Sequence, residues 1–219
     1  MTRKFGLYLC LLCVAMLCYA HFFLQNYLMM KPCEQCVYVR FAVCIIAFGA
    51  FIAFAFPQKL AKALSYALCF WGLYLGFKHS FLLNQIHQAF KEGNAFGIRG
   101  CSHTPNFPFK LPFDEFFPSL FKPNGICGLD TPLIAMEDSI STLQSFFVGS
   151  VENNFTDGFY SKGWFVLPQF EFISMAQACL LVFSVFAVGL GVSFLLWGQK
   201  NLNYALSAVV FTSALIYLY

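Results

Sequence analysis

The residues best suited to chemistry are two cysteines, Cys33 and Cys36, in the stretch 31–40. A Cys-x-x-Cys spacing is typical of redox sites and metal sites. Here it falls between two long apolar runs and therefore at a membrane edge. If a helix begins near Cys36, its unpaired N–H groups and the positive end of its dipole favour a thiolate. Arg40 adds positive charge on the same face. We therefore expect an ionised Cys36 where water meets lipid.

A second pair, Cys101 and Cys127, lies in a long polar segment at about residues 78–171. The other six of the ten cysteines lie inside apolar runs, where cysteine packs as a small hydrophobe. Four cysteines outside those runs indicate disulfide chemistry in an oxidising compartment. A thiolate of one pair can attack the disulfide of the other, so the pairs can exchange in series. A lipid-dissolved quinone could take up the two electrons and two protons that a dithiol releases.

The composition predicts an integral membrane protein. The chain is 59% hydrophobic and 11% charged, whereas soluble domains carry about 25% charged residues. The net charge of +3 comes from few residues and does not suggest a nucleic-acid partner. We expect one all-α membrane domain over residues 1–219, a four-helix transmembrane bundle with a long periplasmic loop. The expected spans are about 5–23, 37–56, 60–77 and 172–197. The third should continue as helix past Lys78 and His79 toward His87, and 204–219 is either a fifth span or an interfacial helix.

Two further expectations concern the surroundings of these spans. Basic residues in short loops mark the cytoplasmic side, and those of this chain are Arg3, Lys4, Lys59, Lys62 and Lys200. Both cysteine pairs then face the other side, which in a bacterium is the periplasm. Aromatic residues crowd positions 113–121 of the loop. This part could lie on the membrane as a short interfacial helix or form a small packed core, and the sequence leaves both possibilities open.

The motifs of this chain resemble the DsbB family of membrane disulfide-generating proteins. Cys-Glu-Gln-Cys followed by Val-Tyr-Val-Arg at the head of the second span is the first likeness. Cys101 and Cys127 match the loop pair of that family in order and spacing. The resemblance is closer to its DsbI branch, and it extends over about residues 5–197. The runs that carry it are 32–38, 107–112, 122–123 and 175–179.

The resemblance implies a thiol-disulfide:quinone oxidoreductase of the bacterial inner membrane. Such an enzyme reoxidises a periplasmic DsbA-like or DsbL-like thioredoxin-fold protein and passes two electrons to ubiquinone or menaquinone. Cys101 would form the mixed disulfide with that partner. Cys127 would then pair transiently with Cys33, which leaves Cys36 as the thiolate that contacts the quinone. The implied quinone site consists of Cys36, Arg40, His87 and Met175, with His79 as a rival to His87.

The early position of the Cys-x-x-Cys argues against a reductase of the vitamin K epoxide class, which carries that motif in a later span. Two other interpretations use the same cysteines. Cys33, Cys36, Cys101 and His103 could hold zinc, because three sulfurs and one nitrogen form a common structural site. That interpretation leaves Cys127 and Arg40 unexplained, and metal analysis of the purified protein would test it. A membrane scaffold with structural disulfides is the second alternative. It predicts cysteines whose redox state does not change with a partner.

Overall fold

The computed structural model describes residues 1–93, 102, 104–134, 140–150 and 153–219. Four helical stretches, Arg3–Tyr27, Glu34–Ala55, Lys59–Lys91 and Met175–Gly198, are long and apolar enough to cross a membrane. The expected all-α membrane fold is therefore confirmed. The helices are α1 (Arg3–Cys18), its π-helical continuation η1 (Tyr19–Tyr27), α2 (Glu34–Ala55), α3 (Lys59–Lys91), α4 (Phe113–Phe116), α5 (Pro118–Phe121), α6 (Thr142–Val148), α7 (Met175–Gly198) and α8 (Leu202–Leu218). The 3₁₀ turns η2 (Pro108–Lys110) and η3 (Pro168–Phe170) and the strands β1 (Phe165–Leu167) and β2 (Phe172–Ser174) complete the order.

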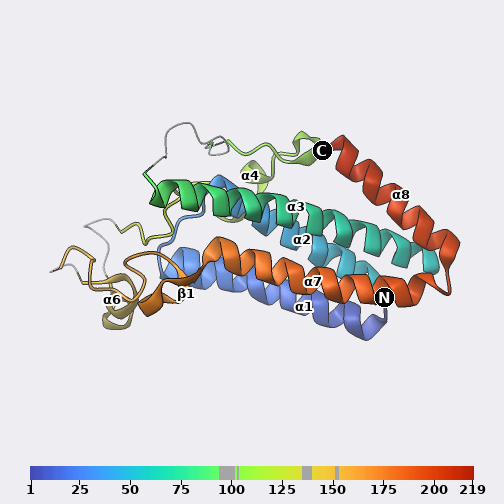
Figure 1. Cartoon of the computed structure of the whole chain (residues 1–219), viewed down its shortest axis with the longest axis horizontal. Coiled ribbons are helices and arrows are strands. Elements are labelled where there is room, and N and C mark those ends of the chain that lie inside the picture. Colours follow the sequence, from blue (N-terminus) through green and yellow to red (C-terminus); the bar gives the residue numbers. More distant parts are fainter. Residues whose placement is uncertain (94–101, 103, 135–139, 151–152) are drawn as a thin grey trace.

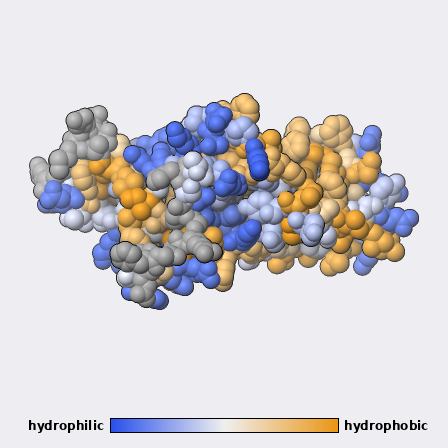
Figure 2. All heavy atoms as spheres, turned by 90° about the horizontal axis from the view of Figure 1, so that it is seen from above, coloured by the Kyte–Doolittle hydropathy of each residue, from blue (hydrophilic) through white to orange (hydrophobic). Residues whose placement is uncertain are grey.

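The long helices run side by side, so that the chain has two distinct ends (Figure 1). One end holds the N-terminus, the turn between α2 and α3 and the turn between α7 and α8. All five basic residues that were expected on one side fall at this end. The other end holds the start of α2, the end of α3, β1 and α6. Figure 2 shows apolar side chains gathered over one half of this face, between hydrophilic side chains at the adjacent end and hydrophilic side chains near the middle of the molecule.

α2 lies at the centre of the bundle, between α1 and α3. In its most apolar window 72% of the residues are buried, compared with 17% in α1 and α7. The outward sides of α1 and α7 therefore face lipid, whereas α2 is enclosed by protein. Gly72 of α3 allows the close approach of α2, because a Cβ there would meet Ile46 and the carbonyl oxygen of Ala42.

Several expected boundaries need correction. α2 begins at Glu34 and not at 37, because Cys33 is its N-cap residue. α3 continues past His79 and His87, as expected, and ends at Lys91, so the long loop begins after Lys91 rather than at 78. The first span continues to Tyr27 because its last nine residues wind as a wider π-helix. The fourth span begins at Met175, after β2.

The aromatic part of the loop forms a small packed core against α2. The ring of Phe107 lies 5.2 Å from that of Phe41 in α2, and Phe113 and Phe121 lie 5.4 and 5.7 Å from Phe107. Only two four-residue helical turns, α4 and α5, occur here. The prediction of a small packed core therefore holds for the rings that face α2. Phe116 points away from them and is exposed.

α8 turns back along α3 and ends near the middle of the bundle (Figure 1). The hydroxyl of Tyr219 lies 2.9 Å from Nε2 of His79, and Nδ1 of the same imidazole lies 2.8 Å from Oε1 of Gln35. The last apolar run is thus a helix packed on the bundle. Its 17 residues are at the short end of what can span a bilayer.

Candidate active site

The two cysteines of the Cys-x-x-Cys motif face one another at the start of α2. Their sulfurs lie 2.7 Å apart, and both thiols are free. Cys33 precedes the helix in an extended conformation, and Cys36 occupies its first turn. This places the two side chains on one side of the turn. A small movement brings the sulfurs to the bonding distance of about 2.05 Å, so the pair can alternate between dithiol and disulfide.

The expected route to a Cys36 thiolate is wrong in this arrangement. The helix starts at Glu34, two residues before Cys36, and the backbone N–H of Cys36 points to the sulfur of Cys33 at 3.4 Å. The unpaired N–H groups and the helix dipole therefore act on Cys33 as the N-cap residue. Cys36 instead faces an apolar pocket and the sulfur of Cys33. A third sulfur beside this pair could exchange with Cys33 and release Cys36.

Such a sulfur is close at hand in Cys127. Cys127 packs with Cys33 and Cys36 in one small buried cluster, which also contains Leu83 and Ala176. It is held in a disulfide bond. Its expected pairing partner, Cys101, lies outside the described residues. Three of the four predicted redox cysteines therefore meet at the same end of the bundle.

Backbone hydrogen bonds hold the Cys127 segment in place. The carbonyl oxygen of Pro32 accepts the N–H groups of Asn124 at 3.1 Å and Gly125 at 3.0 Å. A Cβ on Gly125 would collide with the carbonyl oxygen of Lys31, so only glycine permits this close approach. The loop before Cys127 is thus fixed to the residues before Cys33.

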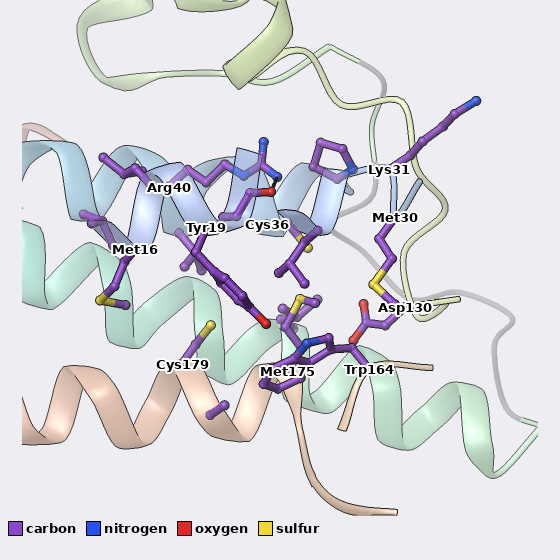
Figure 3. A pocket seen from close by; sticks show the side chains of 18 of the residues that line it. Met16, Tyr19, Met30, Lys31, Cys36, Arg40, Asp130, Trp164, Met175 and Cys179 are labelled. Atoms are coloured by element: carbon purple, nitrogen blue, oxygen red, sulfur yellow. Dashed lines mark hydrogen bonds between the residues drawn. The ribbon is translucent and has the colours of Figure 1, made fainter. Parts of the chain in front are cut away.

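A cavity of about 250 Å³ lies beside Cys36 between α1, α2 and α7 (Figure 3). Its wall is mostly apolar, with Met16, Leu17, Val43 and Val182 among the lining side chains. Polar groups enter it at few points, as in most sites for small organic molecules. The described residues with polar side chains that line it are Tyr19, Lys31, Cys36, Arg40, Asp130, Thr131, Trp164 and Cys179.

Arg40 brings a positive charge to this wall from the turn of α2 after Cys36. It is 8% exposed, and its guanidinium donates to Oε1 of Gln25 at 2.6 Å and to the carbonyl oxygens of Ala20 and Leu120, each at 3.3 Å. These acceptors are all neutral, and none of the ion pairs among the described residues involves Arg40. A buried cation without a carboxylate partner favours a negative charge next to it. Arg40 and Cys36 line the same cavity.

The other residues expected at the quinone site differ in position. Met175, at the head of α7, lines the cavity. His87 does not line it but stands behind Asp130, with Nε2 3.3 Å from the carboxylate and no hydrogen-bond alignment. His79 lies in the Gln35–Tyr219 chain and is not among the lining residues.

The zinc alternative finds no support in the part of the chain that the structure describes. Within that part no three His, Cys, Asp or Glu side chains gather as metal ligands. Cys33 and Cys36 do lie together, but Cys101 and His103 fall outside the described residues. The disulfide at Cys127 and the position of Arg40 are features that a zinc site does not explain.

Comparison with known proteins places this geometry in a family. The model of the family described as "Disulfide bond formation protein DsbB" matches residues 2–193. The chain belongs to the DsbB family. A DsbB-family relative from Campylobacter jejuni that carries the DsbI name is 42% identical over 186 residues, covering 83% of this chain and 69% of the relative. No solved structure matches the chain.

Relatives from Escherichia coli and Salmonella typhimurium also match. The "Protein-disulfide oxidoreductase DsbI" of Escherichia coli is 38% identical over 190 residues, covering 85% of this chain and 82% of the relative. That of Salmonella typhimurium is 40% identical over 185 residues, covering 83% and 79%. The resemblance to the DsbB family and its DsbI branch is therefore confirmed, as is the enzyme class of protein-disulfide oxidoreductase.

Two pocket residues of this DsbB-family chain were missed in the sequence. Trp164 and Asp130 line the cavity, but they come from the long loop, far in sequence from α2. Trp164 enters because β1 and β2 pair as a hairpin, with Phe165 opposite Ser174, directly before α7. Its Nε1 is buried and has no hydrogen-bond partner among the described residues. Their only sequence signal is weak: each lies close to a residue already singled out, Asp130 to Cys127 and Trp164 to Met175.

Proposed function

We propose that this membrane protein-disulfide oxidoreductase passes electrons from a thioredoxin-fold protein through its two cysteine pairs to a quinone. The supporting observation is the position of Cys36. Its sulfur faces Cys33 in the buried cluster that contains Cys127, and its side chain also lines the apolar cavity with Arg40. Cys36 thus lies where thiol exchange and a lipid-soluble acceptor can meet.

The exchange proceeds by balanced thiol–disulfide steps. A thiolate of the partner attacks Cys101 of the Cys101–Cys127 disulfide, and Cys127 leaves as a thiolate. Cys127 attacks Cys33 of the Cys33–Cys36 disulfide, which releases the Cys36 thiolate. The second partner thiolate displaces Cys101, and the partner leaves oxidised. Cys101 then attacks Cys127, which restores the loop disulfide and releases Cys33.

The cavity beside Cys36 suits the head group of a quinone. A quinone held there by these residues would supply a two-electron, two-proton acceptor, so that Cys33 and Cys36 could become a disulfide again. The apolar walls fit a lipid-soluble ring, and the unpaired Nε1–H of Trp164 offers a hydrogen bond to an acceptor oxygen. Arg40 lines the same cavity as Cys36, and its positive charge stabilises the thiolate that forms during exchange. Met175 packs in the wall, and His87 acts through Asp130 rather than by direct contact.

We place the protein in a bacterial inner membrane with both cysteine pairs facing the periplasm. The five basic residues of the short turns and the N-terminus lie at the end of the bundle opposite to Cys33 and Cys36. The reduced partner is then a periplasmic DsbA-like or DsbL-like protein, and the acceptor is ubiquinone or menaquinone. A scaffold with structural disulfides does not account for a free pair of sulfurs at the wall of a cavity.

The test is oxidation of a reduced thioredoxin-fold partner by the purified full chain in nanodiscs that contain ubiquinone or menaquinone. We expect catalytic turnover, and we expect Cys33→Ser, Cys36→Ser, Cys101→Ser and Cys127→Ser each to abolish it. Cys18→Ser is the matched control, because Cys18 is exposed on α1 and outside the cluster. Turnover that persists in Cys36→Ser would contradict the proposal.

A further inference from the structure

Glu34, the residue directly after Cys33, has a buried carboxylate. Glu34 is only 7% exposed. Burying a carboxylate costs free energy unless hydrogen-bond donors satisfy its oxygens. Two donors do so: the hydroxyl of Tyr38 at 3.0 Å and the backbone N–H of Ser102 at 2.6 Å. None of the ion pairs in the described part of the chain involves Glu34. Its partner outside α2 is therefore the backbone of the long loop.

Tyr38 stands one helical turn further along the same face. Its hydroxyl donates to Glu34 and also accepts the backbone N–H of Asn106 at 2.7 Å. The ring is fixed by His79, whose centroid lies 4.4 Å away, and by Phe107 at 5.7 Å. Glu34 and Tyr38 together hold two backbone N–H groups of one loop segment.

This loop segment directly follows a redox cysteine, because Ser102 is the next residue after Cys101. On the other flank, Pro32 holds Asn124 and Gly125 shortly before Cys127. The short stretch 32–38 thus binds backbone on both flanks of the loop pair, while it carries the membrane pair itself. Disulfide exchange requires aligned sulfurs in contact, and holding reacting groups in place accelerates such steps by orders of magnitude.

We propose that Glu34 and Tyr38 form a loop clamp, a pair of positioning residues that hold the segment after Cys101 against the Cys33–Cys36 pair. This inference rests on the proposed function. It assigns the residue next to Cys33 to exchange with the loop and not to the quinone. The loop clamp therefore affects the passage of a disulfide between the two pairs, and it leaves electron delivery from Cys33 and Cys36 to the quinone unchanged.

The experiment separates these two steps in the full chain in nanodiscs. Protein-driven quinone reduction, with a reduced thioredoxin-fold partner, needs the loop pair. Dithiothreitol-driven quinone reduction in a Cys101→Ser/Cys127→Ser background uses the membrane pair alone. We expect Glu34→Ala to slow the protein-driven route about tenfold, as loss of a charge-assisted hydrogen bond predicts. Tyr38→Phe keeps the ring and should slow that route about fivefold, as for a neutral hydrogen bond. Neither change should alter the dithiothreitol-driven rate.

Three comparisons decide the outcome. Glu34→Gln retains an acceptor oxygen and should fall between the wild type and Glu34→Ala. Glu115→Gln, on the exposed α4, is the matched control and should behave as the wild type. Hydrogen exchange of the peptide around 102–107 should rise in Glu34→Ala. Equal slowing of both routes, or slowing of neither, would overturn the loop clamp. A wild-type protein that reduces no quinone by either route would instead overturn the proposed function.

Discussion

The start of α2 makes two kinds of contact that differ in chemistry. The loop side is polar: Pro32, Glu34 and Tyr38 bind loop backbone through hydrogen bonds of 2.6 to 3.1 Å. The cavity side is mostly apolar, and Cys36 and Arg40 are two of the polar groups in its wall. The difference teaches how one short motif can serve two reactants. Water-soluble protein chain is held on one side, and a lipid-soluble molecule fits the other, with the sulfur pair between them.

The largest effect is expected from Gly125→Ala, which disrupts the contacts on the loop side. The new Cβ would collide with the carbonyl oxygen of Lys31 and displace the segment before Cys127. Because a displacement of about 1 Å can cost about 100-fold in rate, we expect a loss of that size in partner oxidation. Gly191→Ala is the matched control, since nothing lies within 4 Å of its added Cβ. Equal rates for the two variants in the turnover assay would show that the loop contact does not position Cys127.

Arg40→Ala tests the cavity side and should have the next largest effect. Removal of the buried charge leaves an anion at Cys36 or in the cavity without its cation. We expect the KM for quinone to rise about tenfold, the size of one charge-assisted hydrogen bond, while the KM for the protein partner changes little. Arg40→Lys keeps the charge but loses the planar contacts to Gln25 and the two carbonyl oxygens, so it should be intermediate. A rise confined to the partner KM would reverse the assignment of the two sides.

Trp164→Phe should give a smaller change on the cavity side. It removes the unpaired Nε1–H but retains most of the apolar ring, so we expect quinone affinity to fall about fivefold. Titration of quinone against protein fluorescence measures this affinity without turnover. Trp71→Phe is a demanding control, because Nε1 of Trp71 is also buried without a partner but lies outside the cavity. If Trp71→Phe weakened quinone binding as much as Trp164→Phe, the N–H of Trp164 would have no specific role.

The smallest effect is expected at Asp157, which lies on neither side. Its exposed carboxylate accepts from the N–H and hydroxyl of Ser150 and from the amide of Asn153, and these hydrogen bonds lower its pKa to about 2. The lowered pKa means that this local stabilisation is present above about pH 3.8 and is lost as the pH falls toward 2. Asp157→Asn should therefore loosen the turn at neutral pH and leave turnover unchanged. Limited proteolysis between pH 7 and pH 2 measures the turn, and a clear loss of turnover would contradict its peripheral role.

The fold could largely be predicted from the sequence because lipid imposes length and apolarity on every span. The apolar runs predicted the four spans. The basic residues of the short turns and the N-terminus predicted that Arg3, Lys59 and Lys200 lie at the same end of the bundle. The boundaries at the cysteine pair were less predictable. Cys33 is the N-cap residue, and its sulfur accepts the capping hydrogen bond. Cysteine is not one of the usual N-cap residues. The predicted helix therefore started too late in the sequence, and the effect of its dipole was assigned to Cys36 instead of Cys33.

The candidate site was predictable where residues are close in sequence and not where the loop folds back. Cys33, Cys36 and Arg40 belong to one helix start, so their spacing fixed their mutual position. Trp164 and Asp130 reach the cavity only through the tertiary path of the loop, which no local pattern encodes. The polar contacts of Glu34 and Tyr38 were missed for the same reason, because their partners are backbone N–H groups some 68 residues away.

The most direct test of the central claim is to trap the disulfides during one turnover. The full chain with bound quinone would be mixed with a reduced thioredoxin-fold partner, quenched with acid at increasing times, alkylated and mapped by mass spectrometry. The account predicts a Cys33–Cys127 disulfide that appears before the quinone is reduced and disappears as the reduced quinone accumulates. Quinone reduction without any Cys33–Cys127 linkage at any time would contradict it.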